Sequence, residues 1–211
     1  MFRMIYRPVI SGAEHVPASG PAIIASNHLS VIDSAVLPLA APRPIAFLAK
    51  AEYFTGRGLK AWATRSVFTA LDAIPVDRSN GRAALVALDA AEEVLAGGRL
   101  FGIYPEGTRS PDGRLYRGRP GVARLALRTG APVIPVGISG TDRMQPRGRR
   151  LPRPARVRVH FGPPLTFAEY QGKEGNRVAQ RAIMDEIMRA IHALSGQEYV
   201  DAYAQPTPPP G

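Results

Sequence analysis

Two side chains five positions apart, His28 and Asp33, have the chemistry of a general base and its orienting partner. A hydroxyl that attacks a thioester must lose its proton, and imidazole suits this task because it titrates near neutrality. A carboxylate bonded to the other ring nitrogen would fix the tautomer and stabilise the imidazolium. The same spacing also fits a loop histidine followed by a carboxylate that favours a helix start, so the pair alone leaves both interpretations open.

Residues 104–110, Tyr-Pro-Glu-Gly-Thr-Arg-Ser, form a second polar group. Gly107 permits an unusual backbone conformation or the close approach of a ligand. Exposed backbone N–H groups together with Arg109 would bind a phosphate, and Glu106 could hold that arginine in place. The alternative is an ordinary Pro–Gly loop with a solvated Glu–Arg pair.

The elements around these groups would bring them to the edge of a sheet. The apolar residues 21–26 predict a buried strand that ends just before His28, and residues 31–39 predict a helix that holds Asp33 in its first turns. Residues 100–104 predict a strand that leads into the second group. His28 therefore follows a strand end, which is where open α/β sheets bind ligands.

Strands and helices alternate along the rest of the chain. Further strands are predicted at residues 45–49, 73–77, 133–139 and 157–161, and further helices at 58–71, 82–95, 121–128 and 177–194. Pro75 favours an edge position for its strand. The alternation predicts an α/β single-domain layered fold with a mixed, largely parallel sheet flanked by helices. We expect this domain to span residues 1–204, before a disordered proline-rich tail at 205–211.

The charge of the chain is +10, and 24 arginines against 3 lysines account for almost all of the basic residues. Such a surface attracts anionic membranes, nucleic acid, or phosphorylated substrates and carriers. The absence of cysteine excludes a disulfide framework, a thiolate nucleophile and a cysteine metal site.

Seven arginines and no acidic residue lie within residues 143–158. The stretch has no interleaved aromatic residues, so we expect no specific nucleic acid partner. We expect a surface loop that faces anionic lipid or an acidic acyl carrier, and a merely solvated loop is the alternative.

The two polar groups resemble the first and third motifs of the glycerolipid acyltransferases, the family that includes lysophosphatidic acid acyltransferase. Those motifs are Asn-His-x4-Asp and Phe-Pro-Glu-Gly-Thr-Arg-Ser, and Tyr104 stands here in place of the usual phenylalanine. A second motif is matched by residues 50–52 with 74–78, and a fourth by residues 133–137. The resemblance covers roughly residues 20–140 and implies a glycerol-3-phosphate acyltransferase-like fold.

The resemblance also implies roles for individual residues. His28 would be the general base, oriented by Asp33, and would activate an acceptor hydroxyl for attack on an acyl-CoA or acyl carrier protein thioester, without an acyl-enzyme, cofactor or metal. The expected substrate-binding residues are Lys50, Arg78 and Arg109 for the acceptor's phosphate, Glu106, Gly107 and Thr108 to shape that site, and Pro135 on the acyl side.

The expected reaction converts 1-acyl-glycerol-3-phosphate to phosphatidic acid, a step of phospholipid biosynthesis. Two alternatives stay open: a different lysophospholipid or glycolipid acceptor, and a non-catalytic lipid- or nucleic-acid-binding protein. Many bacterial members carry apolar helices before the first motif, whereas 26 residues precede Asn27 here, and no secretory signal or membrane span is visible. We expect a cytoplasmic protein bound peripherally to the inner face of the cell membrane, and residues 59–68 could form either an interfacial face or core.

Overall fold

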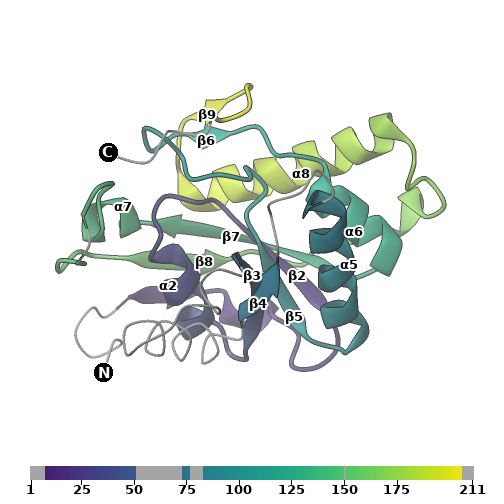
Figure 1. Ribbon diagram of the computed structural model, residues 1–211, viewed down its shortest axis with the longest axis horizontal. Coiled ribbons are helices and arrows are strands. Elements are labelled where there is room, and N and C mark those ends of the chain that lie inside the picture. The colour runs from purple at the N-terminus through teal and green to yellow at the C-terminus, as the bar shows by residue number, and fades with distance from the viewer. Residues whose placement is uncertain (1–7, 51–72, 77–82, 150, 206–211) are drawn as a thin grey trace.

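The computed structural model describes residues 8–50, 73–76, 83–149 and 151–205 (Figure 1). The helix expected at residues 58–71, the interfacial face within it and all but the first residue of the expected tail lie outside these ranges. Among the described residues, no helix is both long and apolar enough to cross a membrane.

A seven-stranded sheet forms the centre of the molecule, with the strand order β1-β8-β7-β2-β5-β3-β4. Its strands are β1 (Val9–Ser11), β2 (Ala22–Ser26), β3 (Ile45–Lys50), β4 (Ala73–Val76), β5 (Leu100–Ile103), β7 (Val133–Ser139) and β8 (Arg158–Phe161). Every neighbouring pair is parallel except β7 and β8. The predicted mixed, largely parallel sheet is thus confirmed, and β4, which carries Pro75, is an edge strand.

Helices cover both faces of the sheet. A large apolar core lies between one face and the helices α5 (Ala83–Ala96), α6 (Gly121–Thr129) and α8 (Arg177–Ser195), and a second core lies under α2 (Asp33–Ala40) on the other face. Side chains alternate along β2, so Ile23 and Ala25 enter the first core while Ala22 and Ile24 enter the second. This is why β2 is apolar throughout and reads as a continuous run.

Close packing places α8 directly on the central strand β7. A Cβ atom on Gly137 would lie 2.5 Å from the backbone carbon of Leu194, a distance that only glycine allows. At its other end, α8 is capped by Asn176, whose side chain accepts hydrogen bonds from the N–H groups of Val178 and Ala179. The position of α8 matters for the site because Gln197, just beyond its end, contacts the loop that carries His28.

The small elements of the chain lie outside the main pattern. Two short parallel strands, β6 (Leu115–Tyr116) and β9 (Tyr199–Val200), form a separate sheet. The short helix α7 (Thr141–Met144) follows β7, and the 3-10 turns η1 (Ala13–His15) and η2 (Ala168–Tyr170) precede β2 and α8.

Three central strands deliver their carboxyl ends to one edge of the sheet. β2 is parallel to both β5 and β7, with Ala25 paired to Ile103 on one side and Ser26 paired to Val136 on the other. The chain that follows β2 carries His28, and the chain that follows β5 carries Glu106. Two groups far apart in the sequence therefore meet because their strands are neighbours.

Candidate active site

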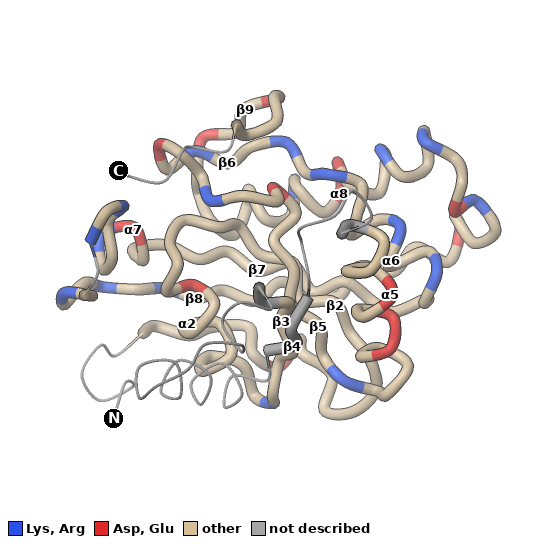
Figure 2. Tube along the Cα trace, in the orientation of Figure 1, with Lys and Arg blue, Asp and Glu red and all other residues tan. Residues whose placement is uncertain are grey.

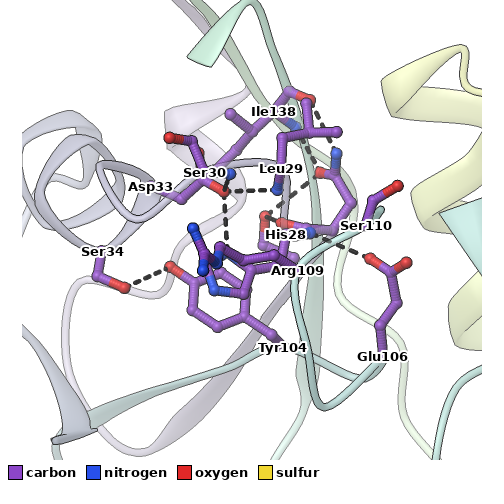
Figure 3. Close-up of polar contacts among 12 residues, drawn as sticks. His28, Leu29, Ser30, Asp33, Ser34, Tyr104, Glu106, Arg109, Ser110 and Ile138 are labelled. Atoms are coloured by element: carbon purple, nitrogen blue, oxygen red, sulfur yellow. Dashed lines mark hydrogen bonds and ion pairs between the residues drawn. The ribbon is translucent and has the colours of Figure 1, made fainter. Parts of the chain in front are cut away.

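The His28 imidazole is hydrogen-bonded to Asp33, as the spacing predicts. Nδ1 of His28 lies 2.9 Å from Oδ2 of Asp33 (Figure 3). The His28 side chain keeps 15% of its surface exposed, whereas Asp33 is completely buried. Nε2 of His28 has no hydrogen-bond partner among the described residues, so the ring presents one nitrogen for a substrate proton.

Asp33 is fixed by the backbone of the loop that it serves. The same oxygen, Oδ2, accepts hydrogen bonds from the N–H groups of Leu29 at 2.7 Å and Ser30 at 2.8 Å. Asp33 is also the first residue of α2, where a carboxylate favours the helix dipole. The helix-start reading and the His–Asp reading are therefore both true of this residue.

The face of the imidazole is covered by Tyr104. The two rings stack with centroids 3.8 Å apart and planes 8° apart. The Tyr104 hydroxyl is hydrogen-bonded to Ser34 Oγ at 3.0 Å, in the first turn of α2. Burial raises the pKa of Tyr104 well above its usual value, so the hydroxyl stays protonated and the ring stays apolar on its inner face. The motif position at which this chain departs from the family pattern thus contacts the proposed base.

Glu106 joins the two motif loops from below the site. Its Oε1 accepts the N–H of His28 at 3.1 Å, and its Oε2 accepts the N–H of Tyr116 at 3.0 Å. The carboxylate is completely buried, and burial raises its pKa from 4.5 to about 7 against the lowering effect of the two backbone N–H groups. Among the described residues, Glu106 makes no ion pair with Arg109, so the expectation that it holds that arginine is wrong.

Asn27 ties the end of β2 to β7. Its side chain donates to the carbonyl of Ile138 at 2.9 Å and accepts the N–H of the same residue at 2.7 Å. The amide also donates to Oε1 of Gln197 at 2.7 Å. The buried asparagine thereby continues the β2–β7 pairing one step past the strand and fixes where His28 begins.

Gly107, Thr108 and Arg109 form the turn beyond Glu106. Gly107 has a φ of +73° and is exposed, and a Cβ atom there would lie 2.9 Å from Cδ of Arg119. Thr108 and Arg109 are half-buried, and Figure 3 shows Arg109 extending across the view of the stacked His28 and Tyr104 rings. Arg147, from the segment after β7, donates to the carbonyls of Arg109 and Ser110 at 2.9 Å each.

The other expected substrate-binding residues are placed less closely. Lys50 is the last residue of β3, with its side chain outside the described part, and Arg78 lies wholly outside it. Pro135 is buried inside β7 opposite Ala25, and its carbonyl accepts the N–H of Gly162 at 2.8 Å. Their roles stay predictions.

Several residues around the site carried no role in the sequence analysis. Asn27 and Tyr104 stand within the motifs, and Ser34, Arg147 and the backbone N–H of Tyr116 lie outside them. A polar residue one turn into a helix gives no local sign that it will bond to a tyrosine seventy positions on. No group of three or more histidine or acidic side chains in the described ranges is arranged to hold a metal ion.

This geometry defines an α/β protein with a His–Asp pair at the carboxyl edge of its sheet. The sequence profile of the Acyltransferase family matches residues 7–139, and the chain belongs to this family.

Known proteins share both sequence and fold with it. A 1-acyl-sn-glycerol-3-phosphate acyltransferase of Limnanthes alba is 34% identical over 164 residues, which are 76% of this chain and 55% of that protein. A chloroplastic protein of the same name from Brassica napus is 32% identical over 144 residues, 68% of this chain and 40% of that protein. This chain therefore spans about half the length of these curated relatives or less.

The crystal structure of the 1-acyl-sn-glycerophosphate acyltransferase PlsC from Thermotoga maritima superposes with a TM-score of 0.62 at 30% identity. The match covers 86% of this chain and 71% of that one, which confirms the predicted acyltransferase-like fold.

Proposed function

We propose that this acyltransferase moves a fatty acyl group from an acyl-CoA or acyl carrier protein thioester to the free hydroxyl of 1-acyl-glycerol-3-phosphate, giving phosphatidic acid. The observation that carries the proposal is the His28–Asp33 pair with an available Nε2. The names of the relatives from Limnanthes alba, Brassica napus and Thermotoga maritima support the choice of acceptor.

The proposed reaction is a direct transfer. Nε2 of His28 takes the proton of the acceptor hydroxyl while the hydroxyl oxygen attacks the thioester carbonyl carbon. Asp33 holds the opposite nitrogen, Nδ1, in its protonated form and stabilises the imidazolium. The tetrahedral intermediate collapses with loss of the thiolate, and His28 returns the proton to the sulfur.

The acceptor's phosphate would bind beside the turn at Gly107. Arg109 is half-buried there, and a guanidinium donates paired hydrogen bonds to phosphate oxygens. Lys50 and Arg78 are proposed as further cations, Glu106 and Thr108 as residues that shape the turn, and Pro135 as part of the acyl side. Glu106 acts through the backbone of His28 in this scheme rather than by touching the substrate.

An acceptor panel tests the proposal. Purified protein should form phosphatidic acid from palmitoyl-CoA and 1-acyl-glycerol-3-phosphate, detected by mass spectrometry, and should be much slower with 1-acyl-glycerol, which lacks the phosphate. Arg109→Gln should raise the KM for the phosphorylated acceptor by about tenfold or more, since a charged hydrogen bond contributes about 1.5–3 kcal/mol. A preference for the unphosphorylated acceptor, or for lysophosphatidylcholine, would replace this acceptor with one of the alternatives.

We also propose that the protein works at the inner face of the cell membrane as a peripheral enzyme. The support is its charge of +10 together with an acceptor that resides in a bilayer.

A further inference from the structure

The stretch at residues 143–158, named here the arginine-rich segment, is exposed along its length. Every one of its described arginines is exposed: Arg143, Arg147, Arg149, Arg153, Arg156 and Arg158. The adjacent Asp142 is the nearest acidic residue in the sequence, and none lies within the segment. In Figure 2 these positions form the blue group around α7 and the loop beyond it, at the left of the view.

The arginines of this segment differ from those elsewhere on the surface in lacking carboxylate partners. Arg114 pairs with Asp112, Arg128 with Glu92, and other exposed arginines are paired in the same way. Among the described residues, no carboxylate forms an ion pair with an arginine of the segment. Unpaired cations gathered on one surface leave a local positive field that only an external anion can neutralise.

The segment is also fixed to the active site. Arg147 donates to the carbonyls of Arg109 and Ser110, and the hydroxyl of Ser30 donates to the carbonyl of Gln145 at 2.8 Å. Met144 is fully buried in the core under the sheet. The charged surface is therefore held at a fixed position beside the loops that carry His28 and Glu106.

Two large apolar side chains are exposed in the same neighbourhood. Leu151, inside the segment, is 76% exposed, and Val31, in the His28 loop next to Ser30, is 58% exposed. Exposed apolar side chains beside arginines are the composition of surfaces that rest on a lipid interface, where the cations meet headgroups and the apolar groups enter the acyl boundary.

We propose that the arginine-rich segment is the surface by which this protein docks on anionic phospholipid. Docking through this surface would hold the His28 loop at the interface, within reach of an acceptor that need not leave the membrane completely. The proposal rests on the proposed function, because a lipid acceptor gives this placement its purpose. An acidic acyl carrier would favour the same charges, but it gives no account of the exposed Leu151 and Val31.

Vesicle co-sedimentation tests the proposal. The variant R143Q/R149Q/R156Q removes three guanidinium groups that make no hydrogen bond with a described residue, so it should fold normally. Its matched control, R124Q/R177Q/R189Q, removes the same charge from exposed positions on α6 and α8. The vesicles are phosphatidylcholine alone, or phosphatidylcholine with about 30 mol % phosphatidylglycerol at about 0.1 M salt.

We expect the wild type and the control to bind the anionic vesicles and not the neutral ones. The segment variant should bind about 100-fold more weakly, since each arginine near an anionic surface contributes about fivefold. Leu151→Ser should weaken binding severalfold at unchanged charge. Equal binding by the two triple variants, or equal binding to both kinds of vesicle, would overturn the proposal. Turnover with a carrier-protein thioester that falls while vesicle binding persists would assign the segment to the carrier instead.

Activity without vesicles separates this proposal from the proposed function. With a water-soluble, short-chain 1-acyl-glycerol-3-phosphate, the segment variant should match the wild type. If the wild type is inactive on every acceptor but its vesicle binding depends on the segment, the proposed function fails and the docking surface stands. If the wild type is active and binds vesicles independently of the segment, the docking surface fails alone.

Discussion

At the scale of single residues, the site is a histidine held on three sides. Asp33 bonds to its Nδ1, Tyr104 covers a ring face, and Glu106 accepts its backbone N–H. Each contact removes one freedom of the imidazole and leaves Nε2 for the substrate. A catalytic group held in this way reacts faster because little reorganisation is left for the transition state.

Tyr104 is expected to act as a positioning residue. Tyr104→Phe keeps the stacked ring and loses only the bond to Ser34, so kcat should fall by about fivefold or less. Tyr104→Leu loses the stack as well, and kcat should fall by about tenfold or more at an unchanged KM for acyl-CoA. Steady-state kinetics with both substrates measure the split.

Ser34→Ala provides the control for this prediction. It should reproduce the Tyr104→Phe value, and the double variant should be no worse than either single one. Equal kcat values for Tyr104→Phe and Tyr104→Leu would show that the stack has no role.

At the scale of elements, the carboxylate of Glu106 links the loops after β2 and β5. Its pKa is about 7 in the folded protein because of burial, against an ordinary value of 4.5. The folded chain thus binds a proton that the unfolded chain releases between these values. This contribution to stability is fully present below about pH 4.5 and is lost as the pH rises through about 7.

Urea unfolding at pH 5 and pH 8 measures the effect. The free energy of unfolding of the wild type should drop, relative to that of Glu106→Gln, by up to about 3 kcal/mol between the two pH values. Glu198→Gln, at an exposed carboxylate, is the control and should run parallel to the wild type. Parallel profiles for Glu106→Gln would show that Glu106 does not titrate in this range.

The contact between α8 and β7 makes a second prediction at this scale. Gly137→Ala places a methyl group 2.5 Å from the backbone of Leu194, so it should lower the free energy of unfolding by about 1–3 kcal/mol or more. Gly121→Ala, at the start of α6, meets no atom within 4 Å and should leave stability unchanged or raise it by up to about 1 kcal/mol. Thermal unfolding compares the two, and equal melting temperatures would contradict the packing argument.

At the scale of the whole molecule, the sheet order decides which parts of the chain can cooperate. β2 lies between β5 and β7, so the two motif loops and the arginine-rich segment emerge side by side. One edge of the sheet therefore combines a general base, a phosphate-binding turn and an unpaired basic surface. We infer that a peripheral enzyme acting on lipid would need these three features on one side.

The long elements could be predicted from the sequence because each is an apolar run or a helical period bounded by glycine or proline. The strand at 133–139 coincides with β7, and the helix predicted at 177–194 ends one residue before α8 does. β1, β6, β9 and α7 are two to four residues long, too short to show a period, and they exist through pairing and burial across the fold.

The site was predictable only where it coincides with the motifs. The His28–Asp33 bond follows from local spacing, whereas the partners of Glu106 depend on strand neighbours. Both motif loops had to be placed before the backbone of His28 and Tyr116 could be seen to meet one carboxylate. Burial, which no spacing reveals, changed Glu106 from a partner of Arg109 into a brace.

Thiol release from palmitoyl-CoA in the presence of 1-acyl-glycerol-3-phosphate, for the wild type, His28→Ala and His160→Ala, tests the central claim most directly. His160 is an exposed histidine outside the site and serves as the control. We predict acceptor-dependent release by the wild type and His160→Ala, and a loss of about 1,000-fold or more in a folded His28→Ala. Acceptor-dependent release that survives in His28→Ala would contradict the account.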